Sequence, residues 1–287
     1  MHYLFAILSA FSSSVTSILG KYSFNIGASP SQILFLRFLF SFIISGIIFI
    51  FLGYKFDFKK FLLYSVLGIL NYGIAAYAFF VGLQYLNPAY ATVLYFTNPI
   101  FVSFFQHRLT KRKINIVNII AVALSFVGVI IANMGERAFG NNESIIFGTL
   151  IVLFSSFVNA IFIVSVSEYI KQNESKPFES VFYTFTGVFI YYFIFVIRTN
   201  EIYTLNGRYL LSGFVLAILA TFVPLTLNFF ALKKLQSHTL SLIMPLELLF
   251  ASILSGIFMN ESFNVLKVLG LIMVGMAPII DITGVES

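Results

Sequence analysis

The fold is decided by apolar stretches such as residues 31–53, SQILFLRFLFSFIISGIIFIFLG, which carry a single charge, that of Arg37. A helix that crosses the hydrocarbon core of a bilayer needs about 20 mostly apolar residues. Charges are rare inside such helices because removing them from water is costly. The stretch therefore predicts a transmembrane helix.

Similar stretches fill the rest of the chain. Only 10% of the 287 residues are charged and 59% are hydrophobic, whereas a soluble domain has roughly 25% charged residues to cover its surface. The sequence thus predicts an all-α integral membrane protein with ten transmembrane helices and no separate soluble domain. The nine further spans are expected at 2–20, 61–83, 88–107, 115–134, 146–169, 178–197, 208–231, 237–258 and 264–281.

The orientation follows from the Lys and Arg residues of the connecting loops. With the N-terminus inside, the inner loops hold eleven of them and the outer loops five, with Arg37 inside a span. Cytoplasmic loops carry the excess of positive charge, so both termini are expected in the cytoplasm of a multi-pass protein in the plasma or inner membrane. The N-terminus lacks a basic segment and a clear cleavage site, so the first span is expected to be retained.

An internal repeat divides the chain. Residues 82–131 align with 231–280 at a constant offset of 149, with Ile100-Phe101-Val102-Ser103 over Leu249-Phe250-Ala251-Ser252. Two halves are expected, at 1–138 and 144–282, each with five spans. An odd number of spans inverts the second half, which gives the inverted repeats of many secondary transporters, with a site near the midplane. The alternative is chance similarity between apolar helices of like composition.

Short motifs in this frame carry a family resemblance. They are Leu36-Arg37-Phe38, Asn98-Pro99-Ile100-Phe101, Leu246-Glu247 and Asn260-Glu261. With two five-helix halves, the chain resembles EamA-type transporters of the drug/metabolite transporter superfamily over essentially its whole length. It departs from their frequent Glu-Pro in the ninth span, where Leu248 follows Glu247, and from their Gly-Glu after the fourth, where it has Lys111-Arg112. The resemblance implies export or exchange of small metabolites, often amino acids.

Glu247 is the sharpest candidate for a site residue. It lies about ten residues into the ninth span, or roughly 15 Å deep at 1.5 Å per residue. A carboxylate there is expected to be protonated, paired or facing an aqueous cavity. Pro245 interrupts the helix beside it, and Asn98, next to Pro99, lies at a similar depth in the fourth span. We expect Glu247 and Asn98 to flank a central site, with Glu247 binding a substrate ammonium or a coupling proton; the alternative is a structural carboxyl bonded between helices.

Arg37 has two interpretations. It could pair with a substrate carboxylate or Glu247, but the favoured interpretation is structural, with the side chain snorkelling or capping backbone carbonyls. Other polar residues are expected to line a cavity, because a buried amide needs partners, or to pack helices closely. The predicted substrate-binding residues are Glu247, Asn98, Tyr95, Asn71, Tyr72, Ser13, Thr16, Asn159, Asn228 and Arg37.

Two further expectations concern packing and histidine. Ala121, Ser125, Gly128 and Ala132 form a stripe of small residues that predicts close packing of the fifth helix, against the tenth with Gly270 and Ala277. His238 begins the ninth span and is expected to be interfacial rather than a proton relay.

Catalytic motifs are not found in the sequence. It has no P-loop, HExxH, nucleophile elbow or metal-ligand cluster, and no Cys, so neither an enzyme nor an ATP-driven pump is expected, and no cofactor or metal. The leading hypothesis is a secondary transporter working by alternating access; the alternatives are a lipid-linked flippase, a non-transporting membrane scaffold and an intramembrane enzyme. The expected partners are a small-molecule substrate, a coupling proton, membrane lipid and a second copy in a homodimer, but not nucleic acid, because the basic residues are scattered over short loops.

Overall fold

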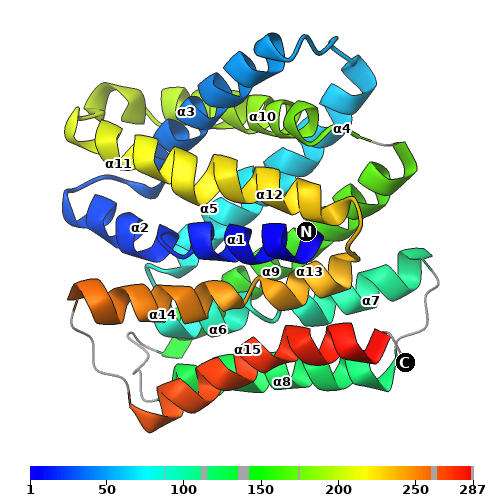
Figure 1. Cartoon of the computed structure of the whole chain (residues 1–287). Coiled ribbons are helices and arrows are strands. Elements are labelled where there is room, and N and C mark those ends of the chain that lie inside the picture. The colour runs from blue at the N-terminus through cyan, green and yellow to red at the C-terminus, as the bar shows by residue number, and fades with distance from the viewer. Residues whose placement is uncertain (87, 111–114, 135–141, 174, 260–263, 286–287) are drawn as a thin grey trace. The chain divides into compact units, whose positions relative to one another are not determined.

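The computed structural model describes residues 1–86, 88–110, 115–134, 142–173, 175–259 and 264–285. These residues form helices and turns without a strand, as the composition predicted. The elements of Figure 1, in chain order, are α1 (His2–Ser13), α2 (Thr16–Asn25), α3 (Pro30–Phe51), α4 (Phe58–Gly68), η1 (Ile69–Ala75), α5 (Ala76–Gly82), α6 (Pro88–Tyr95), α7 (Asn98–Thr110), α8 (Ile116–Ala132), α9 (Asn142–Asn173), α10 (Pro177–Arg198), η2 (Glu201–Thr204), α11 (Arg208–Ala217), η3 (Ile218–Phe222), α12 (Val223–Leu232), α13 (Ser237–Ile243), α14 (Leu246–Met259) and α15 (Val265–Val285).

Seven helical segments within the described residues are long and apolar enough to cross a membrane. Two more, His2–Ser13 and Ile116–Ala132, are apolar but shorter. The integral membrane class is therefore confirmed, while the count of ten spans, the inverted repeat and the orientation stay predictions. The seven are Pro30–Phe51, Phe58–Gly82, Ile145–Asn173, Pro177–Arg198, Arg208–Leu232, Ser237–Leu254 and Val265–Ile282.

Several predicted spans contain an interruption. The fourth breaks between α6 and α7 and the ninth between α13 and α14, while the third and eighth contain the π-helical segments η1 and η3. Proline explains three of these features, the two breaks at Pro99 and Pro245 and the segment η3 before Pro224, because it has no N–H to donate to the carbonyl four residues earlier. Pro99 leaves Tyr95 O without that donor, and Pro224 does the same to Ala220 O. Lipid offers no replacement, so side chains must supply one.

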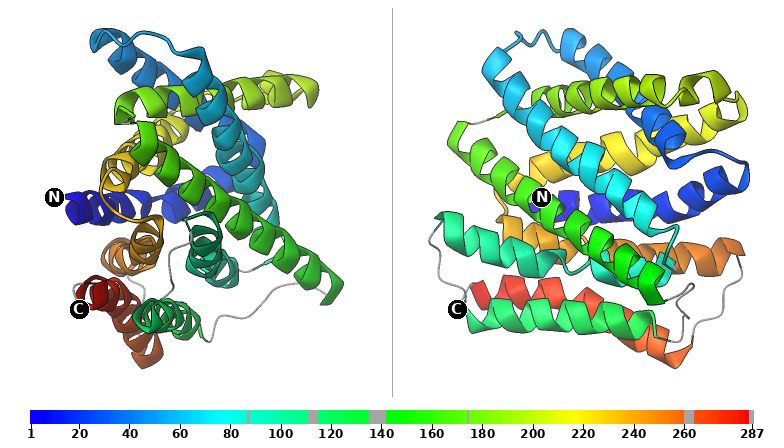
Figure 2. Two further views of the ribbon diagram at one scale, coloured as in Figure 1. Left: turned by 90° about the vertical axis from the view of Figure 1, so that its right-hand side faces the viewer. Right: turned by 180° about the vertical axis from the view of Figure 1, so that it is seen from behind.

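The chain forms two compact units. The first contains Met1–Tyr77 and Val166–Lys234, and the second contains Ala78–Ser165 and Leu235–Ser287, over their described residues. Each unit thus takes chain from both predicted halves. In the first, α10 packs on α3 and α4 (Figures 1 and 2), with the stacked rings of Phe42 and Phe189 4.9 Å apart.

In the second unit, α8 and α15 lie side by side in all views (Figures 1 and 2). A Cβ added to Gly128 would come within 2.9 Å of Gly270 O, a distance that real side chains do not adopt. Ala121 and Ala277 are buried in the same helix pair. The predicted packing of the fifth helix against the tenth is confirmed, and small residues permit it because they let the two backbones approach closely.

Candidate functional site

The break between α6 and α7 is held by α9. Ser156 Oγ on α9 donates to Tyr95 O over 2.9 Å, which replaces the donor that Pro99 lacks. Thr97, between the two helices, is linked to Ser156 through their hydroxyl oxygens, 3.0 Å apart. The carbonyl that the interruption leaves without a helical donor therefore receives a hydrogen bond from a hydroxyl of a neighbouring helix.

Asn98 begins α7 at this break and is 3% exposed. Its Nδ2 donates to Asn159 Oδ1 over 2.8 Å and to Ser156 O over 3.1 Å. Its Oδ1 is buried and accepts no hydrogen bond from the described residues. An unsatisfied buried acceptor costs about 1–3 kcal/mol, so this oxygen is a position at which an N–H or O–H donor from a ligand would be stabilising.

Tyr95 and Glu247 belong to the same unit. Tyr95 is half-buried with its ring 5.1 Å from that of Phe79. Glu247 lies in the first turn of α14, directly after the break at Pro245, and is half-buried. Its N–H donates to Met244 O over 2.9 Å. The predicted interruption of the ninth span by Pro245 is therefore confirmed.

Arg37, in the first unit, caps the π-helical segment of the eighth predicted span. Its side chain is 9% exposed, and Nη2 donates to Ala220 O over 2.5 Å, the carbonyl that Pro224 leaves without a donor. Nε donates to the hydroxyl of Thr221, which itself donates to Leu216 O over 2.9 Å. These contacts agree with the structural interpretation of Arg37, in which it caps backbone carbonyls.

The other π-helical segment, η1, contains Asn71 and Tyr72. Tyr192 of α10 caps it: its hydroxyl is 3.0 Å from Tyr72 O and 2.9 Å from Gly73 O. Phe38 lies against both rings, with its centroid 5.6 Å from that of Tyr192 and 5.8 Å from that of Tyr72. π-Bulges are frequent at functional sites, and here both are held open by a side chain of a neighbouring helix.

Two other predicted residues differ in their hydrogen bonding: Thr16 bonds within its own turn, whereas the Asn228 side-chain oxygen accepts no hydrogen bond from the described residues. Thr16 Oγ1 donates to Ser13 O over 2.5 Å at the junction of α1 and α2. Asn228 Oδ1, on α12, is buried and has no hydrogen-bond partner among the described residues. Of the ten predicted residues, the second unit brings together Asn98 and Asn159. Glu247 and Tyr95 also belong to that unit and the other six to the first, so one central site stays a prediction.

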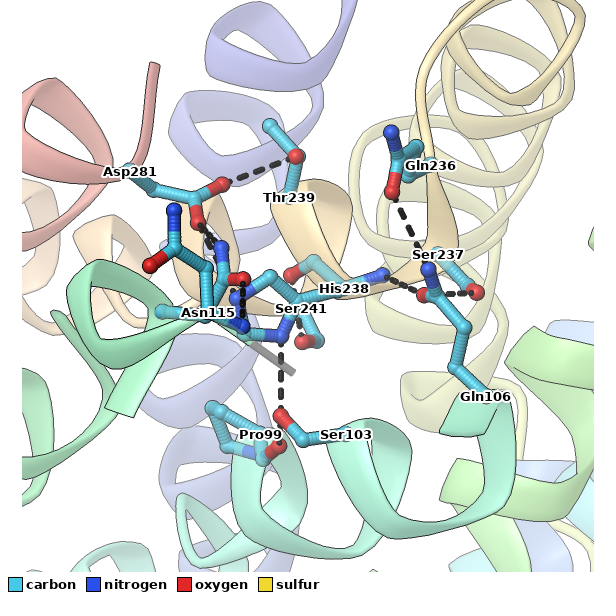
Figure 3. Close-up of polar contacts among 11 residues, drawn as sticks. Pro99, Ser103, Gln106, Asn115, Gln236, Ser237, His238, Thr239, Ser241 and Asp281 are labelled. Carbon is cyan, nitrogen blue, oxygen red and sulfur yellow. Dashed lines mark hydrogen bonds and ion pairs between the residues drawn. The ribbon is translucent and has the colours of Figure 1, made fainter. Parts of the chain in front are cut away.

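A network around His238 escaped the sequence analysis (Figure 3). His238 was expected to be interfacial rather than a proton relay; it is 6% exposed, and its Nε2 lies 3.0 Å from Oδ1 of the fully buried Asp281. Its N–H and Ser237 Oγ both donate to Gln106 Oε1, each over 2.8 Å. The interfacial position of His238 stays a prediction; within the protein, α13 begins against α7, whose Gln106 caps it. The available signal was Asp281, a carboxylate at the end of an apolar run.

Comparison with known proteins agrees with this architecture. The EamA-like transporter family matches residues 1–134 and 146–280. An uncharacterized transporter of Clostridium kluyveri is 26% identical over 295 residues, which cover 97% of this chain and 92% of the relative. One of Archaeoglobus fulgidus is 24% identical over 196 residues, covering 68% and 67% of the two chains.

A solved crystal structure of a protein superposes with a TM-score of 0.82 and 12% identity, covering 100% of this chain and 99% of the other. At that identity the likeness shows the fold alone. The family match spans nearly all of the chain, and the membrane class comes from its helices. The chain belongs to the EamA-like transporter family and is a multi-pass transporter of the cell membrane.

Proposed function

We propose that this chain is a secondary transporter that exports or exchanges small metabolites such as amino acids by alternating access, with both termini in the cytoplasm. The observation that carries the proposal is the Asn98 amide oxygen. It is buried at a helix break and accepts no hydrogen bond from the described residues. Broken helices whose polar groups face a cavity are the way in which many transporters build a substrate site within the membrane.

An amine is the donor that we assign to this acceptor. Asn98 Nδ2 is already bound to Asn159 and Ser156, so only the oxygen remains for a ligand. An ammonium N–H donated to it would form a charge-assisted hydrogen bond, which is roughly twice as strong as a neutral one. Glu247, on the helix that follows the Pro245 break, supplies the negative charge that an amino-acid ammonium requires.

Alternating access requires helices that can change their arrangement between two states of the transporter. The interrupted spans supply candidate joints: the α6–α7 and α13–α14 breaks and the segments η1 and η3. The family match falls in two segments of similar length, 1–134 and 146–280. These observations support a pair of related halves that rock about a site, as inverted-repeat transporters do.

Transport in proteoliposomes tests the proposal. Purified protein is reconstituted, and uptake of a panel of labelled amino acids is compared with that of protein-free liposomes. We expect uptake for part of the panel, and Asn98→Ala to reduce apparent affinity about tenfold to a hundredfold, from a lost charge-assisted bond of about 1.5–3 kcal/mol. Asn133→Ala is the matched control, because within the described residues the Asn133 amide donates to Val129 O of its own helix.

Two results would contradict the proposal. If no amino acid enters beyond the protein-free background, while the protein is folded and correctly reconstituted, the assigned substrate class is wrong. If Asn98→Ala and Asn133→Ala transport as well as the wild type, the site at the α6–α7 break is wrong.

A further inference from the structure

His238 sits between a carboxylate and a hydroxyl inside the second unit (Figure 3). Its Nε2 lies 3.0 Å from Asp281 Oδ1, and its Nδ1 lies 2.8 Å from Ser103 Oγ. Gln106 accepts from the Ser237 hydroxyl and the His238 backbone N–H, which holds the start of α13 in place. Both ring nitrogens thus have a partner, in a cluster that contains a 0% exposed carboxylate.

The partners of Asp281 indicate that it is ionised. Asn118 Nδ2 donates to Oδ1 over 2.6 Å and Thr239 Oγ1 donates to Oδ2 over 2.8 Å. The Asn118 amide cannot be reversed without cost, because its own Oδ1 accepts the Asn115 N–H over 3.1 Å. The carboxylate form of Asp281 accepts from the oriented Asn118 amide and from the Thr239 hydroxyl together, and it requires His238 Nε2 to carry a proton toward Oδ1.

The Ser103 hydroxyl links the other ring nitrogen, Nδ1, to the Pro99 carbonyl. Its hydroxyl oxygen lies 2.6 Å from Pro99 O and 2.8 Å from His238 Nδ1, but it has one proton to donate. When Nδ1 is protonated, it donates to Ser103 Oγ, and the Ser103 hydroxyl is free to donate to Pro99 O. When Nδ1 is bare, it competes with Pro99 O for that same proton. Gain or loss of a proton at Nδ1 therefore alters the hydrogen bonding of the first turn of α7.

That turn begins with Asn98, the residue before Pro99. We propose that His238, held by Asp281, is the proton-binding site of the transporter, and that Ser103 transmits its protonation to the turn that carries Asn98. This rests on the proposed function and assigns a proton as its coupling ion. The proton adds to Nδ1 from water on one side of the membrane and returns to water on the other side. Glu247 is then left to bind the substrate ammonium.

No other ionisable side chain on the described helices around α13 takes the place of Asp281 beside the His238 ring. The first of the helices packed against α13, α7, carries His107 and Arg108, both exposed in its last turn. The next, α8, carries no ionisable residue, and α15 carries Lys267 fourteen positions from Asp281 along the helix. On α14, Glu247 lies nine positions after His238. Among the described residues, Asp281 is the carboxylate that contacts the ring.

Nitrogen NMR of histidine tests the site without a substrate. The chain has three His, so His2→Gln with His107→Gln leaves His238 alone to be read in ¹⁵N-histidine-labelled protein in lipid nanodiscs. With rising pH, we expect the Nδ1 signal to move from its protonated to its bare position while Nε2 keeps its proton. A ring that stays in one state over the whole pH range in which the helices remain folded overturns the proposal.

The relay to α7 is read at the Pro99 carbonyl. Labelling Pro with ¹³C at its carbonyl and Ile with ¹⁵N selects the two Pro-Ile pairs of the chain, 99–100 and 278–279, and Pro278→Ala identifies the second. The Pro99 carbonyl should shift with the Nδ1 titration in the wild type and in Ser103→Thr, which keeps a hydroxyl, but not in Ser103→Ala. A shift that persists in Ser103→Ala overturns the relay.

These results separate the inference from the proposed function. NMR needs no transported substrate, so a silent His238 in protein that transports amino acids refutes only the proton site. Titration and relay in protein that transports no amino acid refute the proposed substrate class instead. Where both succeed, amino-acid uptake should lose its dependence on an imposed pH gradient in Ser103→Ala.

Discussion

Replacing Arg37 by Met tests how the membrane core tolerates Pro224. The substitution keeps an apolar side chain of similar length but leaves Ala220 O without its described donor. Hydrogen bonds between membrane helices average about 0.6 kcal/mol, and Arg37 makes two of them to η3. An orphaned buried carbonyl costs about 1–3 kcal/mol. Because removal of a buried charge offsets part of this cost, we expect a net loss of about 2 kcal/mol.

The rescue variant is Pro224→Ala, which restores the N–H that the helix lacks at that position. If Arg37 compensates for the proline, Pro224→Ala should stabilise the Arg37→Met background more than it stabilises the wild type. The difference, measured as a double-mutant cycle, should be about 1 kcal/mol. The chain has no Trp, so unfolding is followed by circular dichroism during SDS titration of protein in mixed micelles.

The reasoning is refuted by either of two outcomes. One is an Arg37→Met protein whose unfolding free energy equals that of the wild type. The other is a cycle without coupling, in which Pro224→Ala has the same effect in both backgrounds. Arg37→Lys separates charge from geometry, because a single ammonium cannot reproduce the guanidinium fork that reaches Ala220 O and Thr221 together.

Two further substitutions test the packing of the second unit and its breaks, each with a matched control, by the same SDS titration. Ser156→Ala removes the hydroxyl that donates to Tyr95 O and should cost about 1 kcal/mol. Ser167→Ala on the same helix should cost nothing, because that buried hydroxyl has no hydrogen-bond partner in the described part of the chain. Equal losses in the two variants would contradict the compensation of Pro99. Gly128→Val should cost about 3 kcal/mol or more through overpacking against α15. Gly207→Ala should lie within about 0.5 kcal/mol of the wild type, since none of the described atoms lies within 4 Å of its added Cβ. A tolerated valine at 128 would mean that the helices are further apart.

The sequence predicted what depends on local patterns. The apolar runs predicted the membrane class, the small-residue stripe of Gly128 predicted the contact between α8 and α15, and Pro245 predicted the break before Glu247. The carbonyl-capping interpretation of Arg37 agrees with the structure, because a buried arginine needs acceptors.

Long-range pairing could not be predicted in this way. His238 and Asp281 are 43 positions apart, and Ser156 and Tyr95 are 61 apart. One sequence contains no signal for which serine meets which carbonyl, since most serines in apolar helices bond within their own turn. Nor does one sequence show which carbonyls Tyr192 caps in η1 and Arg37 caps in η3, although Pro224 marks the position of η3.

The central claim, that the Asn98 oxygen receives a substrate ammonium, is tested most directly by ligand-induced stabilisation. Detergent-solubilised protein is melted with each amino acid of the panel, since a ligand that binds the folded state raises the melting temperature. We predict a rise for the wild type and for Ser156→Ala, which perturbs the same break but keeps Asn98, and little or none for Asn98→Ala. An equal rise in folded Asn98→Ala protein would contradict the account.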